Sequence, residues 1–164
     1  MKLTVITVSD SVARGTRADA SGDSIAVWAI ARGYTVASRV TVADESVDIV
    51  RALLDACDDG DCELVVTTGG TGLAKRDVTP EATRAVIAAE APGFVDQMRD
   101  NATRFPRAVL SRGIAGVRGR TLIVNLPGSV GGVRDGLAVL APIVEHACDI
   151  LSGRVKEHGS VHGT

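Results

Sequence analysis

One stretch near the middle of the chain constrains the fold most, because it combines a buried strand, a glycine loop and a helix start. Residues 64–68 are all apolar or β-branched, which is typical of a strand inside a parallel sheet. A loop with three glycines, residues 69–72, follows at once. The tripeptide Thr79-Pro80-Glu81 then has the composition of the first turn of a helix. A strand joined to a helix in this way predicts an α/β protein.

The glycine loop has the chemistry needed to hold a phosphate group. Glycines let the backbone come close to a ligand, while threonine hydroxyls and free N–H groups supply hydrogen bonds. The spacing matches neither common fingerprint: Lys75 follows Leu73-Ala74 instead of the glycine of a P-loop, and it occupies the third glycine position of a dinucleotide motif that starts at Gly70. Two readings stay open, a phosphate-binding loop and a loop whose glycines serve only the turn.

Composition argues against nucleic acid as a partner. The chain has 18 basic and 20 acidic residues and a formal net charge of −2, so it offers no excess of cations to a phosphate backbone. Aromatic residues make up only 2% of the chain, which leaves little for base stacking. We therefore expect a small-molecule ligand instead of a nucleic acid.

The cysteines and the apolar runs bear on the compartment. Cys57, Cys62 and Cys148 are an odd set whose spacing fits no zinc pattern, so we expect reduced thiols that pack as small apolar side chains. No run of about 18 apolar residues exists, so no membrane span is expected. No signal peptide precedes the first predicted strand. These observations predict a cytoplasmic protein.

Strand and helix patterns alternate along the chain. Strands are expected at 2–9, 34–42, 64–68 and 121–126, and residues 113–119 are expected as loop. Helices are expected at 23–32, from Asp44 to Cys57 with Val47 among its apolar positions, from Thr79 through Val86 and Ile87, at 94–105, and from 129 to 151 with a kink or break at Pro142. The alternation predicts an α/β three-layer sandwich, a mostly parallel sheet with helices on both faces. We expect a single domain over residues 1–152 and a flexible C-terminal tail over 153–164.

Several polar residues follow predicted strands, where ligands of open α/β sheets gather. Ser9, Asp10 and Ser11 lie at the end of the first strand, and Asp44 follows the second. Each also has a simpler interpretation: the first three residues could serve only to turn the chain, and Asp44 would be a good N-cap. Thr79 is expected to cap its helix. At Ser129 a phosphate cradle built from helix amides and a plain N-cap are both open.

Four motifs, in order and covering roughly residues 5 to 150, resemble the MogA/MoaB family, which handles molybdopterin in molybdenum-cofactor biosynthesis. They are Thr67–Gly72 with Arg76–Ala82, Ala91–Phe94 with Gln97–Arg99, Leu110–Arg112, and Asn125–Ser129. The resemblance implies a molybdopterin adenylyltransferase, which moves AMP from ATP to the molybdopterin phosphate and releases pyrophosphate. The alternative is a non-catalytic molybdopterin-binding or carrier protein of the same fold.

The resemblance also implies a site and partners. Asp44 and Asp77 look like the family's two catalytic aspartates, and we expect them to hold Mg²⁺ on the phosphates of ATP, since this ion takes one or two protein carboxylates. The expected substrate-binding residues are Ser9, Asp10, Ser11, Thr67, Thr68, Gly69, Gly70, Thr71, Gly72, Ser111, Pro127, Gly128 and Ser129. The expected partners are molybdopterin and ATP, with assembly as a homotrimer and hand-over of the product to a molybdenum insertase.

Overall fold

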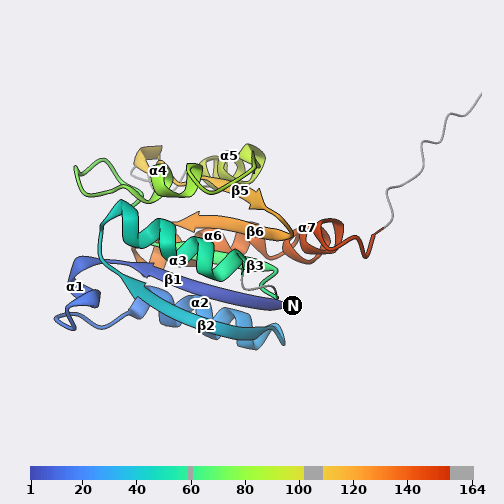
Figure 1. Cartoon of the computed structure of the whole chain (residues 1–164), viewed down its shortest axis with the longest axis horizontal. Coiled ribbons are helices and arrows are strands. Elements are labelled where there is room, and N and C mark those ends of the chain that lie inside the picture. Colours follow the sequence, from blue (N-terminus) through green and yellow to red (C-terminus); the bar gives the residue numbers. More distant parts are fainter. Residues whose placement is uncertain (59–60, 102–108, 156–164) are drawn as a thin grey trace, which may run out of the picture.

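Six strands form one mixed sheet in the order β2-β1-β3-β6-β5-β4 (Figure 1). The computed structural model describes residues 1–58, 61–101 and 109–155. The strands are β1 (Lys2–Val8), β2 (Thr35–Val42), β3 (Leu64–Thr68), β4 (Ala89–Glu90), β5 (Ala115–Arg118) and β6 (Thr121–Leu126). The helices are α1 (Asp10–Ala13), α2 (Ala20–Ala31), α3 (Ser46–Asp58), α4 (Thr79–Arg84), α5 (Pro92–Asn101), α6 (Val130–Leu140) and α7 (Val144–Leu151).

The central strands are parallel, as predicted. β1 pairs with β2 and β3, and β3 pairs with β6, so the carboxyl ends of four strands meet at one edge of the sheet. β5 is antiparallel to β6, and β4 is antiparallel to β5. The prediction of a loop over 113–119 is therefore wrong. The glycines of this segment made it resemble a loop in the sequence. In the structure Gly116 has a packing role: a Cβ there would lie 2.7 Å from the carbonyl oxygen of Ala89, so only glycine lets β4 come this close.

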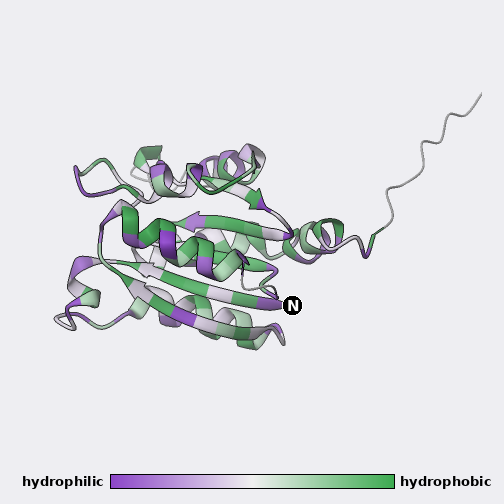
Figure 2. Ribbon diagram, in the orientation of Figure 1, coloured by the Kyte–Doolittle hydropathy of each residue, from purple (hydrophilic) through white to green (hydrophobic). Residues whose placement is uncertain are grey.

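Helices cover both faces of the sheet, which confirms the three-layer arrangement. Neighbouring residues of a strand point to opposite faces, so Val65 and Val66 of β3 belong to different cores. Val65 packs in the core that includes Leu53 of α3, and Val66 in the core that includes Ile25 of α2 and Leu137 of α6. The inner strands are accordingly apolar along most of their length (Figure 2). Among the described residues, no helix is long and apolar enough to cross a bilayer.

Several helix boundaries differ from the sequence prediction. α2 begins at Ala20 because Asp19 caps it, accepting a hydrogen bond from the N–H of Gly22 at 2.9 Å. Within α3, Val47 is 66% exposed, so its expected core position is wrong. The buried face consists of Ile49, Ala52 and Leu53, which are spaced three and four residues apart as one face of a helix requires. The predicted break at Pro142 is confirmed, since it separates α6 from α7.

Thr79 does not cap α4. It is the first residue of that helix, and the N-cap residue is Val78, whose side chain makes no capping bond. The Thr79 hydroxyl instead donates to the carbonyl oxygen of Gly69 at 2.9 Å. α4 also ends at Arg84, before Val86. The capping prediction was wrong because Thr79 already lies inside the helix, and its hydroxyl serves to close the glycine loop.

Two further expectations concern the thiols and the tail. Cys57, Cys62 and Cys148 are free thiols, and burial raises the pKa of Cys57 to about 11 and that of Cys148 to about 12. Residues 156–164 lie outside the described part of the chain, as do residues 102–105 of the helix expected at 94–105. α5 itself starts at Pro92, two residues before the predicted start at residue 94.

Asn125 ties the sheet to α4, and its loss should destabilise the fold. The residue is 2% exposed; its amide nitrogen donates to the hydroxyls of Thr67 and Thr83, both at 3.0 Å, and its side-chain oxygen accepts from the N–H of Ile114 at 3.2 Å. Asn125→Ala leaves these groups without their partner, so we expect a loss of about 2–3 kcal/mol in urea unfolding. Thr67→Val, which removes one of the bonds, should cost less, and an equal or smaller cost for Asn125→Ala would contradict this role.

Candidate functional site

The candidate site lies where the parallel strands end, at the left of Figure 1, beside α1 and the loop that precedes α4. Side chains there surround a cavity of about 250 Å³. It is lined by Thr7, Val8, Ser9, Arg17, Ser21, Asp44, Thr68, Gly69, Gly70 and Gly128. Six of the predicted site residues are in this lining, namely Ser9, Asp44, Thr68, Gly69, Gly70 and Gly128.

The glycine loop packs directly against two neighbouring segments of backbone. Gly69 has a φ of +97°, and a Cβ there would lie 2.2 Å from the carbonyl oxygen of Val8. A Cβ on Gly128 would lie 3.2 Å from the Cα of Gly69. The hydroxyl of Thr68 donates to the carbonyl oxygen of Pro127 at 2.8 Å. The ends of β1, β3 and β6 therefore form one close-packed floor that only glycines allow.

Asp44 is bound to the end of β1 and not to its own helix. One of its oxygens, Oδ2, accepts from the N–H of Asp10 at 2.8 Å, and Oδ1 of Asp10 accepts from the N–H of Asp44 at 3.2 Å. α3 begins two residues later, at Ser46. The reading of Asp44 as an N-cap is wrong, because its carboxylate is used to join the ends of β1 and β2.

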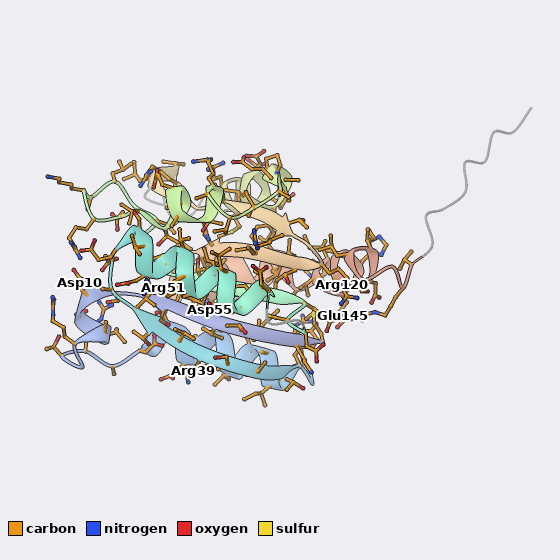
Figure 3. The ribbon with its side chains drawn as sticks, in the orientation of Figure 1. Asp10, Arg39, Arg51, Asp55, Arg120 and Glu145 are labelled. Carbon is orange, nitrogen blue, oxygen red and sulfur yellow. The ribbon has the colours of Figure 1, made fainter. Side chains whose placement is uncertain are left out.

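Arg76 extends this contact to the glycine loop. Its Nε and Nη2 donate to the two oxygens of Asp10 at 2.9 and 3.0 Å, and its Nη1 donates to Glu45 at 2.9 Å. The hydrogen bonds from Arg76, followed by the N–H of Asp44, hold the pKa of Asp10 below its usual value. The hydrogen bonds to Asp10 and Glu45 raise the pKa of Arg76. Asp10 lies at the end of the sheet opposite to Arg120 and Glu145 (Figure 3).

Asp77 follows Arg76 and is fixed by its own turn. Its Oδ2 accepts from the N–H of Ala74 at 2.8 Å. Arg112 holds the same turn, since it donates to the carbonyl oxygens of Gly72 and Asp77. Asp44 and Asp77 are both half-buried at this edge of the sheet, and they are connected through Asp10 and Arg76. Among the described residues, no hydrogen bond or ion pair engages Oδ1 of either aspartate.

The donor set suits a hard cation. No group of three or more His, Cys, Asp or Glu side chains that could hold a metal occurs in residues 1–58, 61–101 or 109–155. Mg²⁺ needs no such group, because it takes one or two carboxylates and fills its remaining positions with phosphate oxygens and water. The free oxygens of Asp44 and Asp77 are ligands of this kind.

Other predicted site residues lie away from the cavity. Thr67 is fully buried and accepts from Asn125, so its side chain does not reach the cavity. The hydroxyls of Thr71 and Ser111 are 3.3 Å apart, which joins the glycine loop to the segment before β5. Ser111 and Pro127 line a separate, smaller cavity of about 50 Å³.

The serines resolve two of the open alternatives. Ser129 caps α6, accepting from the N–H of Gly132 at 3.1 Å, so its side chain follows the simpler reading. Ser9 caps α1 in the same way, and its hydroxyl lies 3.1 Å from that of Ser11. Ser9 and Ser11 therefore shape the turn after β1, and Ser9 also lines the cavity.

Arg17 is a site residue that sequence reasoning missed. It lines the cavity together with the glycine loop, and its Nη2 donates to the Ser9 hydroxyl at 3.2 Å. A guanidinium and a glycine-rich floor in one small cavity form an anion-binding environment. The only signal in the sequence was the polar loop at 14–22, which does not by itself indicate which of its arginines turns inward.

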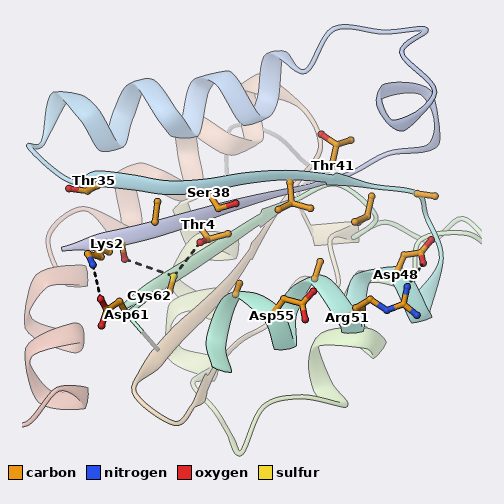
Figure 4. A pocket seen from close by; sticks show the side chains of 16 residues that line it. Lys2, Thr4, Thr35, Ser38, Thr41, Asp48, Arg51, Asp55, Asp61 and Cys62 are labelled. Atoms are coloured by element: carbon orange, nitrogen blue, oxygen red, sulfur yellow. Dashed lines mark hydrogen bonds and ion pairs between the residues drawn. The ribbon is translucent and has the colours of Figure 1, made fainter. Parts of the chain in front are cut away.

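A larger cavity lies elsewhere and contains none of the predicted site residues. It is a groove of about 800 Å³ between β2 and α3 (Figure 4). Its walls combine apolar residues such as Val40 and Ala52 with charged residues at the rim, among them Asp48, Arg51 and Asp55. The groove exists because α3 packs over β1 and β3 and leaves one face of the edge strand uncovered.

Comparison with known proteins identifies the family of the chain. A family model described as "Probable molybdopterin binding domain" matches residues 4–146. The chain belongs to this family. The match runs from β1 into α7, and therefore includes the glycine loop, Asp44, Arg76 and Asp77.

Curated members of the molybdopterin-binding family include clear relatives of the chain. A molybdopterin adenylyltransferase of Helicobacter pylori strain J99 is 39% identical over 154 residues, which cover 91% of this chain and 86% of that protein. A molybdopterin adenylyltransferase of Escherichia coli K12 is 37% identical over 141 residues, covering 84% of this chain and 72% of that protein.

Solved structures of the family share the fold. The molybdopterin biosynthesis enzyme MoaB of Thermus thermophilus has a TM-score of 0.87 and 43% identity, over 93% of this chain and 96% of that chain. The molybdopterin biosynthesis Mog protein of Mycobacterium ulcerans has a TM-score of 0.86 and 44% identity, over 92% of this chain and 98% of that chain. At this level of identity the sheet order and the glycine loop are expected to be shared.

Proposed function

We propose that the chain is a molybdopterin adenylyltransferase, which transfers AMP from ATP to the phosphate of molybdopterin and releases pyrophosphate. One observation carries the proposal: Asp44 lines a glycine-floored cavity that also contains an arginine, and it is linked through Asp10 and Arg76 to Asp77 in the loop before α4. Each of the two aspartates keeps one carboxylate oxygen that no other described residue engages. The curated relatives named molybdopterin adenylyltransferase support the same reaction.

The chemistry asks for alignment and charge compensation. An oxygen of the molybdopterin phosphate attacks the α-phosphorus of ATP, and the bond from that phosphorus to the bridging oxygen of the β-phosphate breaks. The nucleophile is already an anion, so no side chain has to remove a proton. Two anionic reactants must instead be brought together and their repulsion offset. The side chains of the site would meet both needs by binding the two reactants close together and by placing positive charge beside their phosphates.

Roles can be assigned to individual residues. Asp44 and Asp77 would hold Mg²⁺ through their Oδ1 atoms, and the ion, when bound, neutralises phosphate charge and orients the triphosphate. Arg17, the Ser9 hydroxyl and the floor made by Gly69, Gly70 and Gly128 would hold a phosphate group in the cavity. The narrow space around Ser111 and Pro127 would border the pterin.

Assembly and context belong to the same proposal. We propose that residues 1–152 form the molybdopterin-binding domain with 153–164 as its tail, and that the protein acts in the cytoplasm as a homotrimer. It would pass the adenylylated pterin to a molybdenum insertase. Light scattering of the purified protein tests the trimer, and a monomer in solution would remove that part of the proposal.

The reaction has a direct test. Purified protein is mixed with ATP, MgCl₂ and molybdopterin, and both pyrophosphate and the adenylylated pterin are measured. We expect the two products in equal amounts and none after chelation of the metal with EDTA, because the charge on the phosphates is then uncompensated. Molybdopterin binding without pyrophosphate release would favour the alternative, a non-catalytic carrier, and would overturn the proposed reaction.

A further inference from the structure

We propose that Asp10 and Arg76 are positioning residues that fix Asp44 and Asp77 at the spacing needed to share one Mg²⁺. The inference rests on the proposed function, because it concerns the same two aspartates. It assigns a task to two charged side chains that the reaction itself does not use.

The contact between Asp10 and Asp44 is reciprocal. Each backbone N–H donates to the carboxylate of the other residue, at 2.8 and 3.2 Å. Such a closed pair fixes both the backbone and the carboxylate plane of Asp44. It also uses Oδ2 of Asp44 and directs Oδ1 elsewhere. The ends of β1 and β2 are thus held together at the residue that would bind the metal.

Arg76 holds this pair from the side of the glycine loop. Its guanidinium binds both oxygens of Asp10, the two-pronged geometry that arginine forms best with a carboxylate, and its third contact is to Glu45, the residue after Asp44. Arg76 precedes Asp77 in the chain. One side chain therefore connects the backbone that carries Asp44 to the backbone that carries Asp77.

Both carboxylate oxygens of Asp10 already accept hydrogen bonds, which distinguishes this residue from a metal ligand. Its Oδ1 accepts from both Asp44 and Arg76, and its Oδ2 accepts from Arg76. An oxygen that already faces a guanidinium is poorly placed to bind a cation as well. Asp10 therefore acts through Asp44, as residues behind a metal ligand commonly do.

Stability does not account for this arrangement. The side chain of Arg76 is 52% exposed, and exposed ion pairs contribute little to folding. Arg84 provides a matched comparison, because its side chain is also 52% exposed and also pairs with a carboxylate, Glu90, at 2.8 Å. The two arginines differ in whether their partner is bound to a proposed metal ligand.

A double-mutant cycle tests the inference. Asp10→Ala, Arg76→Ala and the double variant are titrated with Mg²⁺ in the presence of α,β-methylene-ATP, whose α-phosphorus cannot be transferred, and binding is followed by calorimetry. We expect each single variant to weaken Mg²⁺ binding about tenfold, the scale typical of residues that orient metal ligands. The double variant should be no weaker than the weaker single variant, because the two residues act as one unit.

Further variants separate positioning from a general loss of structure. Arg84→Ala should leave Mg²⁺ binding unchanged, and Arg76→Lys, which keeps the charge but loses the two-pronged contact, should fall between wild type and Arg76→Ala. Both oxygens of Asp10 are used within the protein, so the positioning role replaces its predicted contact to substrate. Molybdopterin affinity, measured without metal or nucleotide, should therefore not change in any variant. In turnover we expect the Mg²⁺ concentration at half-maximal rate to rise by the same factor as the dissociation constant.

Several results would overturn the inference. Additive losses in the cycle would mean that Arg76 contacts the nucleotide independently of Asp10, and unchanged Mg²⁺ binding would mean that neither residue positions a ligand. A loss of molybdopterin affinity would indicate damage to the loop. Wild-type protein that binds Mg²⁺ with the nucleotide analogue but releases no pyrophosphate would overturn the proposed reaction alone, since the cycle needs no turnover.

Discussion

Asp77→Asn is expected to lower the rate of adenylyl transfer about 10²–10³-fold while molybdopterin binding persists. The range is that for removing one preorganised electrostatic contact to a reacting group. The substitution removes the negative charge that would hold the metal. It keeps an oxygen that can accept from the N–H of Ala74, so the turn stays closed. Asp77→Ala should lose the rate as well, but it also removes the contact to Ala74.

The measurement is pyrophosphate release at saturating ATP and molybdopterin, together with molybdopterin affinity. Asp48→Asn serves as the control, because Asp48 is a partly exposed carboxylate in the first turn of α3 whose partner is Arg51 and not a site residue. Full activity of Asp77→Asn would remove this residue from the metal site. Equal losses of activity and of molybdopterin binding would instead indicate that the loop had collapsed.

Gly69→Ala is expected to disrupt the site through the backbone. A Cβ on Gly69 would lie 2.2 Å from the carbonyl oxygen of Val8, at a φ of +97°. The oxygen is part of β1 and cannot move aside without breaking the sheet edge. We expect a loss of about 3 kcal/mol in the free energy of unfolding, from backbone strain and overpacking together. Molybdopterin and nucleotide binding should both be lost, because the floor of the cavity moves.

Gly33→Ala separates the two causes. Gly33 has a φ of +75°, close to that of Gly69, but a Cβ there meets no atom within 4 Å. This variant should lose only about 1 kcal/mol and keep its ligands, because it carries the strain without the collision. Urea unfolding and ligand titration of both variants provide the comparison. Similar losses in the two would show that the close packing against Val8 is unimportant.

The strands and the site edge could be predicted because their signals are local. A run such as Leu64–Thr68 has its strand character in its own composition, and a polar residue after a strand is easily recognised. The helix break at Pro142 is equally local. The place of Asp44 at the carboxyl edge of the sheet followed from its position directly after a predicted strand, whereas Asp77 was assigned through the family resemblance.

What could not be predicted depends on contacts between distant segments. The partner of Asp44 is Asp10, which is 34 residues away, and the partner of Asp10 is Arg76, which is 66 residues away. The sequence suggests a capping role for the Thr79 hydroxyl, but the helix starts one residue earlier than a cap at Thr79 requires, and the hydroxyl donates to the carbonyl oxygen of Gly69, a contact set by the tertiary fold. β4 and β5 escaped notice because a two-residue strand and a glycine-containing strand have almost no pattern of their own.

The direction of β1 has a practical consequence for experiments on this protein. The strand starts at Lys2 and ends beside the cavity, so its seven residues separate the amino terminus from the candidate site by roughly 20 Å. Met1 lies at the right-hand end of the sheet in Figure 1, where its ammonium pairs with Glu63 at 3.7 Å. An affinity tag or a surface linker attached at this end would therefore leave the pocket open during ligand titrations.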